Sequence, residues 1–380
     1  MHSVKLHYTL SQRDDSAPAS DAGLLRHPLM TLLQSVANLG SISAAARDLG
    51  LSYRHVWGEL KRWEEVMGQE LIIWEKGQSA KLSEFGAKLM WAERQTQARL
   101  TPQIEALRAD LERTFAVAFD PDAHVLALYA SHDDALPRLR EFAASTGLHL
   151  DMRFCGSVDA IRALNEGRCT LAGFHTQAQP ALGTHAELAY QHLLKPGLHK
   201  IIGFATRTQG LMVAPGNPLH LHSLADVVRT QARFVQRSLG TGTRVLLEDL
   251  MQQAHLNSQD LLTTPDAEPS HTALAEAIAA GRGDVGLGLE STARARGLGF
   301  VALTQEHFHL VCLKSALETP ATQALRRVLH DTDWLSQLNT LAGYQSDHSG
   351  EVQSLRAMLP WWSFKQAKKS AHPGVRYPHH

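Results

Sequence analysis

The pattern of apolar and polar residues changes near Val125, and this change constrains the fold more strongly than any other feature of the chain. Beyond it, short apolar segments alternate with amphipathic segments of helical spacing. The first three apolar segments are HVLALYA (124–130), LHLDMRF (148–154) and CTLAGFH (169–175). Strands that alternate with helices form parallel sheets with helices on their faces. The sequence therefore predicts a two-lobed α/β domain over residues 122–345.

The same alternation continues through the second half of this domain. GLMVAPGNPL (210–219) is predicted as a strand and a turn, and RFVQRSLGTGTRVLLEDLM (233–251) as a strand, a loop and a helix. HTALAEAIAAGRGDVGLGLEST (271–292) has the pattern of a helix, a strand and a short helix. GFVALTQEHFHLVCLK (299–314) is predicted to form two more strands. This is enough for a second α/β lobe and a return of the chain to the first.

Length and composition narrow the class of protein. At 380 residues the chain is long enough for two or three domains. Its 44% hydrophobic and 20% charged residues are typical of a soluble globular protein, and its net charge of −1 gives no global attraction to nucleic acid. The three cysteines are scattered, and neither a signal peptide nor a run of about 20 apolar residues is evident. These features predict a cytoplasmic protein that does not interact with a membrane.

The N-terminal part of the chain predicts a small helical module. Residues 1–23 are polar and aperiodic, which predicts a flexible N-terminus, and a first amphipathic helix follows them. Ser41 or Ser43 can cap a second, short helix, and Ser52 can cap a third. Two helices joined by a tight glycine turn form the helix-turn-helix pattern. The sequence thus predicts an all-α winged helix-turn-helix domain over residues 24–82.

The exposed face predicted for the third helix is unusual for a solvated surface. Tyr53, Trp57 and Lys61 are four residues apart, so they line one side of the helix. Arginine pairs with guanine edges in DNA, and aromatic side chains can contact thymine methyl groups or sugars. This face predicts DNA recognition, whereas the alternative is a helical hairpin with a packed tryptophan.

A strand, a glycine-containing turn and a second strand follow the third helix, as in a wing. Lysines on such a wing are placed to contact phosphates beside the groove. The residues predicted to bind DNA are Ser41, Ser43, Ser52, Tyr53, Arg54, His55, Trp57, Lys61, Lys76 and Lys81.

An apolar stripe extends along residues 83–120. Apolar side chains recur every three or four residues from Phe85 to Phe115, as in a coiled-coil seam. Pro102 would kink a helix, so Thr101 is predicted to cap a second one. We expect this linker to form a homodimer or homotetramer, which would place two recognition helices on DNA half-sites. Packing of the linker on its own domain is the alternative.

Small polar loops follow the predicted strands, at the edge where open α/β sheets bind ligands. In RSLGTGTR (237–244) the glycines let backbone N–H groups converge, and the hydroxyl groups and the next helix N-terminus favour an anion. Arginines would add charge-assisted hydrogen bonds. Ordinary connections with helix caps are the alternative. The residues predicted to bind a ligand are Ser131, His132, Gly156, Ser157, His175, Arg237, Gly242, Thr243, Arg244, Ser270 and His271.

The sequence offers little for catalysis or metal binding. Ser131, His132 and Asp133 are adjacent in one loop, and adjacent residues cannot form a nucleophile, base and orienting acid in line. The histidine pairs have no cysteine or acid cluster at metal-site spacing. We therefore expect a protein that is not an enzyme, binds no metal ion and requires no cofactor. Residues 360–380 are basic and aperiodic, which predicts a tail.

Two parts of the chain resemble known bacterial families. The run LGSISAAARDLGLSYRHVWGELKRWEEVMGQELI, followed by KLSEFG, resembles the winged helix-turn-helix of LysR-type regulators over residues 28–95. Its SY..VW variation is similar to the molybdate-responsive ModE regulators. The segments ATRTQGLMVAPGNP, RSLGTGTR and LAGYQSDHSGEV resemble a periplasmic-binding-protein-like domain that occurs in bacterial regulators and is fused to molybdopterin-biosynthesis proteins.

These resemblances imply a ligand-responsive transcriptional regulator whose partner is a double-stranded DNA operator. They imply a small anionic effector such as molybdate or tungstate, and control of molybdoenzyme genes such as those of formate dehydrogenase. Formate, another small carboxylate or a molybdopterin-type cofactor stays open as the effector. An enzyme or a transport binding protein is the remote alternative, and operator DNA bound by residues 1–120 would separate these classes.

Overall fold

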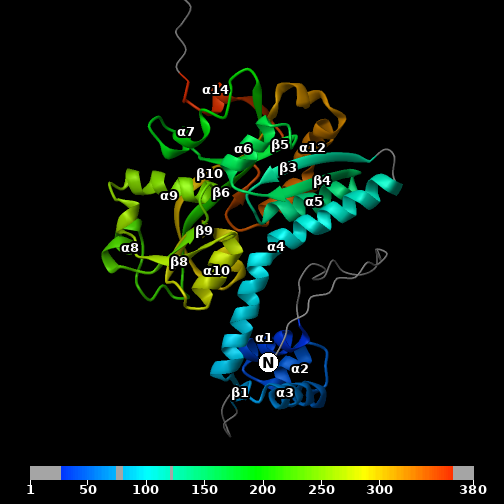
Figure 1. Ribbon diagram of the computed structural model, residues 1–380, viewed down its shortest axis with the longest axis vertical. Coiled ribbons are helices and arrows are strands. Elements are labelled where there is room, and N and C mark those ends of the chain that lie inside the picture. The colour runs from blue at the N-terminus through cyan, green and yellow to red at the C-terminus, as the bar shows by residue number, and fades with distance from the viewer. Residues whose placement is uncertain (1–26, 74–79, 120–122, 363–380) are drawn as a thin grey trace, which may run out of the picture.

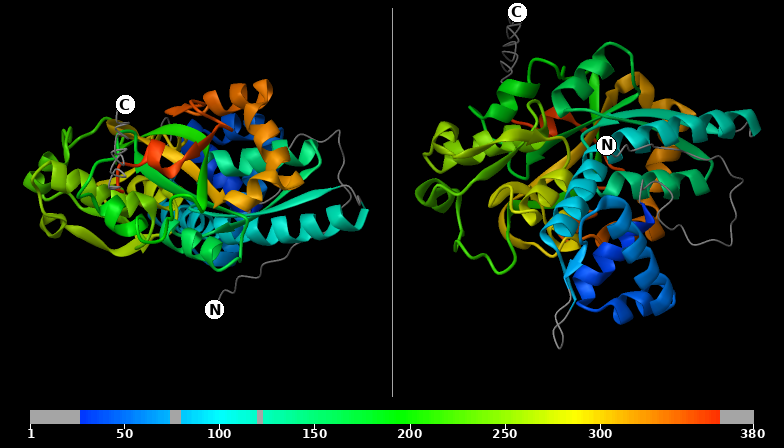
Figure 2. Two further views of the ribbon diagram at one scale, coloured as in Figure 1. Left: turned by 90° about the horizontal axis from the view of Figure 1, so that it is seen from above. Right: turned by 60° about the horizontal axis from the view of Figure 1, so that its bottom comes forward.

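The computed structural model describes residues 27–73, 80–119 and 123–362. In Figure 1 and the right-hand view of Figure 2, a small N-terminal module projects from a larger α/β domain, and the long helix α4 (Glu84–Phe119) joins them. Among the described residues no single helix is long and apolar enough to cross a membrane. The first two helices, which are bent relative to each other, reach the required length and apolar composition only when they are taken together.

The N-terminal module contains the three predicted helices and two short strands. They are α1 (Pro28–Leu39), α2 (Ile42–Asp48), α3 (Tyr53–Met67), β1 (Ile72–Ile73) and β2 (Lys81–Leu82). Ser41 accepts the Ala44 N–H at 3.3 Å and Ser52 accepts the His55 N–H at 3.1 Å, so both cap a helix as predicted. Ser43 lies exposed inside α2 instead. Buried apolar side chains, including Leu33 and Leu60, form a core among the three helices.

Helix α4 is continuous over 36 residues, which corrects the predicted start of a second helix at Thr101. Pro102 lies inside α4, although proline lacks the N–H that an α-helix bonds and its ring crowds the preceding turn. Figure 1 shows that α4 changes direction between the N-terminal module and the far end of the α/β domain. Proline is a common cause of bends in continuous helices, so a proline inside α4 is compatible with a single bent helix.

The α/β domain contains ten strands and ten helices within the described residues. The strands are β3 (His124–Ala130), β4 (Leu148–Phe154), β5 (Leu171–Gln177), β6 (His199–Val213), β7 (Phe234–Arg237), β8 (Thr263–Glu268), β9 (Val285–Leu289), β10 (Gly299–Leu313), β11 (Tyr344–Gln345) and β12 (Val352–Ser354). The helices are α5 (Ala135–Ser145), α6 (Ser157–Asn165), α7 (His185–Tyr190), α8 (Leu224–Thr230), α9 (Gly242–Gln253), α10 (His271–Ala279), α11 (Glu290–Ala295), α12 (Pro320–His330), α13 (Thr332–Asn339) and α14 (Leu355–Met358), with 3-10 turns at Ser258–Asp260 and Lys314–Glu318.

Two long antiparallel strands divide the sheet into two lobes. The strand order is β4-β3-β5-β10-β6-β9-β7-β8, and β11 and β12 pair with β6. Strands β3, β4 and β5 are mutually parallel in lobe one, as are β7, β8 and β9 in lobe two. Strands β6 and β10 run antiparallel to each other through both lobes. The two-lobed α/β prediction is confirmed, but the sheet is mixed rather than parallel.

The prediction of two strands within residues 299–314 is wrong, because this segment forms the single 15-residue strand β10. The polar run Thr304–Glu306 interrupts the apolar pattern in the sequence. In the structure Glu306 is buried and paired with Arg207 on β6, so the polar residues stay within the strand. Irregular register near Ala302 and Phe308 lets the long strand bend between the lobes.

Helices cover both faces of the sheet (Figures 1 and 2). In lobe one, α5, α12 and α13 enclose one apolar core and α6, α7 and α14 enclose another. In lobe two, α8 and α9 cover one face and α10 and α11 the other. Packing on lobe one continues beyond residue 345, since Trp361 is buried and donates its indole N–H to the Ala181 carbonyl at 3.2 Å.

Candidate functional site

The exposed side of α3 carries the side chains that the sequence aligns there. The rings of Tyr53 and Trp57 stack with centroids 6.4 Å apart, and the Lys61 ammonium lies 5.0 Å from the Trp57 ring. Arg54 and His55 are exposed beside them. Lys61 also pairs with Glu64 at 2.6 Å, which orients the lysine along the helix. Trp57 is half-buried and also packs against the core of the module, so this side of α3 is a polar and aromatic ridge anchored by its tryptophan.

The wing is described only in part. Lys81 on β2 is exposed, and Lys76 lies outside the described residues. Glu64 accepts N–H groups from Leu71 at 2.9 Å and Ile72 at 3.3 Å, which fixes the start of the wing to α3. Burial raises the pKa of Glu64, but the bonds from Lys61 and these two N–H groups lower it overall. Its carboxylate therefore stays ionised and holds the two parts together.

A second site lies where the two lobes meet, and it is closed. A Cβ at Gly156 of lobe one would lie 2.5 Å from the Gly240 carbonyl oxygen of lobe two, so only glycine permits this approach. A Cβ at Gly242 would lie 3.2 Å from Cγ of His175 and 3.3 Å from the Ser157 hydroxyl. The N-termini of α6 and α9 thus face each other, with their positive dipole ends at the cleft.

Arg237 brings a buried positive charge to this cleft. Its Nε donates to the Glu268 carbonyl at 3.2 Å and its Nη2 to the Pro269 carbonyl at 3.0 Å. The remaining nitrogen, Nη1, is buried without a hydrogen-bond partner. Burial, and then the charge of Arg207, lower the pKa of Arg237 to about 9, so it remains protonated at neutral pH. The cleft therefore offers charged N–H donors that no protein group uses.

Histidines surround this arginine. His175 packs on Phe308 with ring centroids 4.2 Å apart, and neither of its ring nitrogens has a hydrogen-bond partner. His271 Nε2 lies 3.3 Å from the Thr243 hydroxyl. Burial lowers the pKa of both histidines far below its usual value, with contributions from Arg207 and Arg237. The two rings are neutral, and His175 keeps an unused N–H donor.

The floor of the cleft is a buried ionic network that sequence reasoning missed. Arg207 on β6 pairs with Asp133 and Glu306, and the Tyr344 hydroxyl donates to Asp133 at 2.6 Å. Gln209 donates to Glu306 at 2.7 Å and approaches the Thr243 hydroxyl at 3.4 Å. In the sequence, this network is indicated by two polar residues, Arg207 and Gln209, inside the apolar segment ATRTQGLM (205–212).

Arg207 and Arg237 differ in whether carboxylates compensate their positive charge. Burial alone would lower the pKa of Arg207, but the carboxylates of Glu306 and Asp133 raise it well above its usual value. Arg207 is thus compensated by two acids. Arg237 instead bonds to two backbone carbonyls, and no ion pair to it is found among the described residues. Arg237 is therefore the group in the cleft that favours an added negative charge.

The structure brings most of the predicted ligand residues together, but not all of them. Gly156, Ser157, His175, Arg237, Gly242, Thr243 and His271 converge on the cleft or its edges, and Ser131 is buried directly after β3. Ser270 instead caps α10 through the Ala273 N–H at 3.0 Å and donates its hydroxyl to the Ala98 carbonyl of α4. Arg244 pairs with Glu248 at 3.1 Å along α9, because four residues place both on one helix side, and it lines the same small pocket as Arg237 and Thr243.

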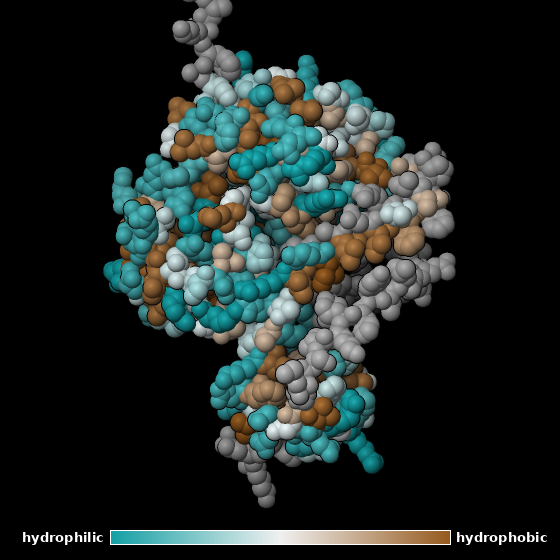
Figure 3. Space-filling view, viewed as in Figure 1, coloured by the Kyte–Doolittle hydropathy of each residue, from teal (hydrophilic) through white to brown (hydrophobic). Residues whose placement is uncertain are grey.

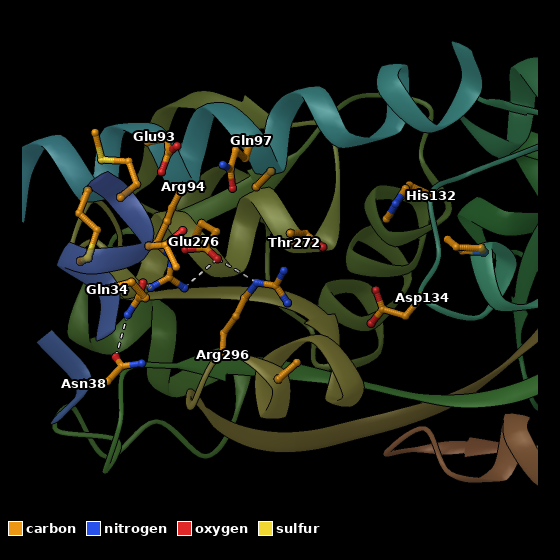
Figure 4. Close-up of a pocket in the computed structure, with 16 residues that line it drawn as sticks. Gln34, Asn38, Glu93, Arg94, Gln97, His132, Asp134, Thr272, Glu276 and Arg296 are labelled. Atoms are coloured by element: carbon orange, nitrogen blue, oxygen red, sulfur yellow. Dashed lines mark hydrogen bonds and ion pairs between the residues drawn. The ribbon is translucent and has the colours of Figure 1, made fainter. Parts of the chain in front are cut away.

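His132 lies between the cleft and a larger cavity. This cavity, of about 740 Å³, is enclosed by α1, α4, α10 and α11 and by the loop that precedes α5 (Figure 4). Within it Glu276 pairs with Arg94 at 2.9 Å and with Arg296 at 3.1 Å. The cavity therefore lies between the N-terminal module, α4 and the α/β domain. In the described part of the chain, no cluster of three or more histidine, cysteine or acidic residues could hold a metal ion.

Comparison with known proteins assigns both parts of the chain. Residues 139–330, half of the chain, match the PBP superfamily domain. Residues 28–87 match the bacterial regulatory helix-turn-helix protein, lysR family.

Individual relatives add little about activity. The uncharacterized protein YvgK of Bacillus subtilis (strain 168) is 24% identical over 234 residues, which cover 61% of this chain and 75% of YvgK. An uncharacterized protein in the ferredoxin 2Fe-2S gene 5' region of Clostridium pasteurianum is 26% identical over 84 residues, covering 22% of this chain and 74% of that protein. The OxyR C206 mutant of Corynebacterium glutamicum aligns with a TM-score of 0.40 and 14% identity over 80% of this chain and 90% of that one.

Proposed function

We propose a function from the premise that this chain belongs to the PBP superfamily and carries a lysR-family helix-turn-helix at its N-terminus. It is a ligand-responsive transcriptional regulator of the LysR type rather than an enzyme. The finer proposal is that its effector is a small oxyanion of the molybdate or tungstate kind, bound in the closed cleft between the lobes.

One observation supports the anion: the cleft contains buried donors without acceptors. Arg237 Nη1 and the His175 ring nitrogens are buried and lack hydrogen-bond partners. A buried donor without an acceptor is destabilising by about 1–3 kcal/mol, so such groups favour binding of an acceptor. The N-termini of α6 and α9 add positive dipole ends. We propose that an oxyanion accepts hydrogen bonds from these donors.

The closed geometry favours a small effector. The backbones at Gly156 and Gly240 are in contact, so a bulky ligand would require the lobes to separate. This argues against a molybdopterin-type cofactor in the closed state. Formate or another small carboxylate remains the alternative, and a carboxylate has two oxygens for the donors where a tetrahedral oxyanion has four.

A titration distinguishes these candidates. Isothermal calorimetry with molybdate, tungstate, sulfate and formate measures which anion binds the full-length protein, and a thermal-shift series checks stabilisation. We expect molybdate and tungstate to bind more tightly than formate and to raise the melting temperature. Binding of formate alone would replace the oxyanion by the carboxylate. An absence of binding by all four would overturn the anion proposal.

The output we propose is a change in operator binding by a homodimer or homotetramer in the cytoplasm, with molybdoenzyme genes as targets. Exposed Leu107 and Phe115 on the far half of α4 support assembly through this helix, where Figure 3 shows a run of apolar surface. Leu107→Asp should reduce the mass measured by light scattering, whereas Leu182→Asp, at another exposed leucine, should not. An unchanged mass for Leu107→Asp would exclude assembly through this face. Mapping the genomic sites to which the protein binds tests whether molybdoenzyme genes are its targets.

A further inference from the structure

One short segment, Glu268–Pro269–Ser270–His271, contacts the cleft and the linker helix at the same time. We refer to it as the bridge segment; it joins β8 to α10. On the cleft side, Arg237 donates to the carbonyls of Glu268 and Pro269, and His271 lies 3.3 Å from the Thr243 hydroxyl. The backbone N–H of Ser238 also donates to the Glu268 carbonyl at 3.2 Å. The backbone of the bridge segment is therefore tied to the cleft residue that carries the unused donors.

On its other side the bridge segment is bonded to α4. The Glu268 carboxylate accepts from Arg99 Nε at 2.9 Å and Nη2 at 2.8 Å, and from Gln95 at 3.3 Å. The Ser270 hydroxyl donates to the Ala98 carbonyl at 3.3 Å. A guanidinium that binds one carboxylate through two N–H groups fixes both distance and angle. These contacts hold one turn of α4 against the edge of lobe two.

The burial of Glu268 makes this connection stiff. Its side chain is 2% exposed whereas that of Arg99 is 38% exposed, so the carboxylate cannot exchange the arginine for bulk water without a rearrangement. The bond to Glu268 raises the pKa of Arg99. Because the carbonyl and the carboxylate of Glu268 belong to one residue, a displacement of Arg237 reaches Arg99 through a single amino acid.

We propose that Glu268 and Arg99 are positioning residues that transmit occupation of the cleft to the DNA-binding module through α4. This inference rests on the proposed function, in which an anion engages Arg237. An anion that draws Arg237 toward it shifts the carbonyls of Glu268 and Pro269, and the carboxylate on the same residue moves α4 at Arg99. A ligand changes DNA affinity only if it favours one arrangement of this helix over another.

A neighbouring ion pair provides a matched control. Arg94 on the same helix binds Glu276 of α10, which also binds Arg296 (Figure 4). This contact docks α4 on lobe two, and no hydrogen bond from it to a cleft residue is found among the described residues. Lys88 pairs with exposed Glu84 at 2.5 Å and serves as a control for charge removal on α4.

The test compares four variants of the full-length protein: Arg99→Met, Glu268→Gln, Arg94→Met and Lys88→Met. Molybdate is the probe, and the DNA is a duplex selected from a random pool by the wild-type protein. Calorimetry gives the molybdate Kd, and fluorescence anisotropy gives the DNA Kd with and without molybdate. Coupling between sites is typically about 5- to 150-fold in such a ratio.

We expect the ratio of DNA Kd values to fall toward 1 in Arg99→Met and Glu268→Gln, with the molybdate Kd within about threefold of wild type as the check on folding. Arg94→Met and Lys88→Met should keep the wild-type ratio. A wild-type ratio in Arg99→Met overturns the proposal. Equal loss in Arg94→Met also overturns it, because docking of α4 in general would then explain the coupling.

A ligand-free measurement separates this inference from the proposed effector. If wild-type protein does not bind molybdate, the effector proposal fails, and hydrogen exchange on Arg237→Met decides about the bridge segment. Faster amide exchange in both residues 266–271 and the turn of α4 around Arg99 supports transmission. A change confined to the cleft loops overturns it. Lys88→Met gives the baseline for α4 itself.

Discussion

The two functional regions of this molecule are built in opposite ways. The side of α3 that we propose to face DNA takes its residues from one helix, and Tyr53, Arg54 and His55 are exposed to water. The cleft takes its residues from several separate segments, and Arg237, His175 and His271 are almost completely buried. The difference is what the two proposed ligands require. A duplex presents a groove large enough for a whole helix, whereas a small ion must be surrounded after its water is removed.

This contrast has an energetic consequence. An exposed arginine is hydrated when its partner is absent, so its loss removes only the contact it makes. A buried donor has lost its water already, and the protein gains its full contribution only when a ligand supplies the acceptor. Substitutions in the cleft should therefore have larger effects on ligand binding than substitutions on α3 have on DNA binding.

The largest expected effect is that of Arg237→Met on molybdate binding. Removal of one partner of a buried charged contact typically costs about 2–5 kcal/mol, which is roughly 30- to 5,000-fold in Kd. Arg233→Met, which breaks an exposed pair with Asp284, should change the Kd by less than about threefold. Calorimetry on both variants measures the difference. A loss in Arg237→Met no greater than in Arg233→Met would contradict the assignment of this cleft.

The next effect is that of Arg54→Ala on DNA binding. Loss of a side chain that reads a base edge costs about 1–3 kcal/mol, or roughly 5- to 150-fold in DNA affinity. Molybdate affinity should not change, since α3 makes no part of the cleft. Arg229→Ala removes the same charge from α8 and should leave DNA binding unaltered. Equal losses in the two variants would indicate that net charge rather than recognition controls the affinity.

The same contrast explains what could be predicted from the sequence. The caps Ser41 and Ser52 and the alignment of Tyr53, Trp57 and Lys61 depend on residues three or four apart, and these predictions are confirmed. Local spacing determines them, because a helix repeats about every 3.6 residues. The strands and helices that alternate in lobe one were predictable for the same reason.

The sequence could not place residues whose neighbours are distant along the chain. Arg207 meets Glu306 only after β6 and β10 pair, and both look like interruptions in apolar strands. Arg207 meets Asp133 only when the loop after β3 packs against β6. Ser270 was a plausible cleft residue by its loop, but α4 packs behind that loop and accepts its hydroxyl. Long-range pairing and the docking of a separate helix decide such positions, and neither has a local sequence signal.

Acidification should affect the buried region through its histidines. Burial, and to a smaller extent His307, lower the pKa of His309 from about 6.5 to about 3. The folded histidine is then neutral where the unfolded one gains a proton, so stability is lost as pH falls through about 6.5 toward about 3. At about pH 5.5 this histidine should reduce the free energy of unfolding by about 1.4 kcal/mol relative to about pH 7.5.

Urea unfolding at several pH values measures this loss. His309→Gln should remove the part of the pH dependence of the unfolding free energy that His309 contributes. His222→Gln, at an exposed position, should retain the full pH dependence. An identical slope in His309→Gln and wild type would show that this buried ring is not the group that titrates.

The smallest effect is expected for Lys81→Ala on the wing. A lysine that contacts a phosphate contributes to affinity without reading sequence, so its loss should weaken binding about two- to fivefold on selected and scrambled DNA alike. The slope of log affinity against log salt should fall by about 1. Lys88→Ala, which removes an exposed ion pair on α4, should change neither quantity. If Lys81→Ala weakened only the selected duplex, the wing would read bases, and the division between a reading helix and a positioning wing would not hold.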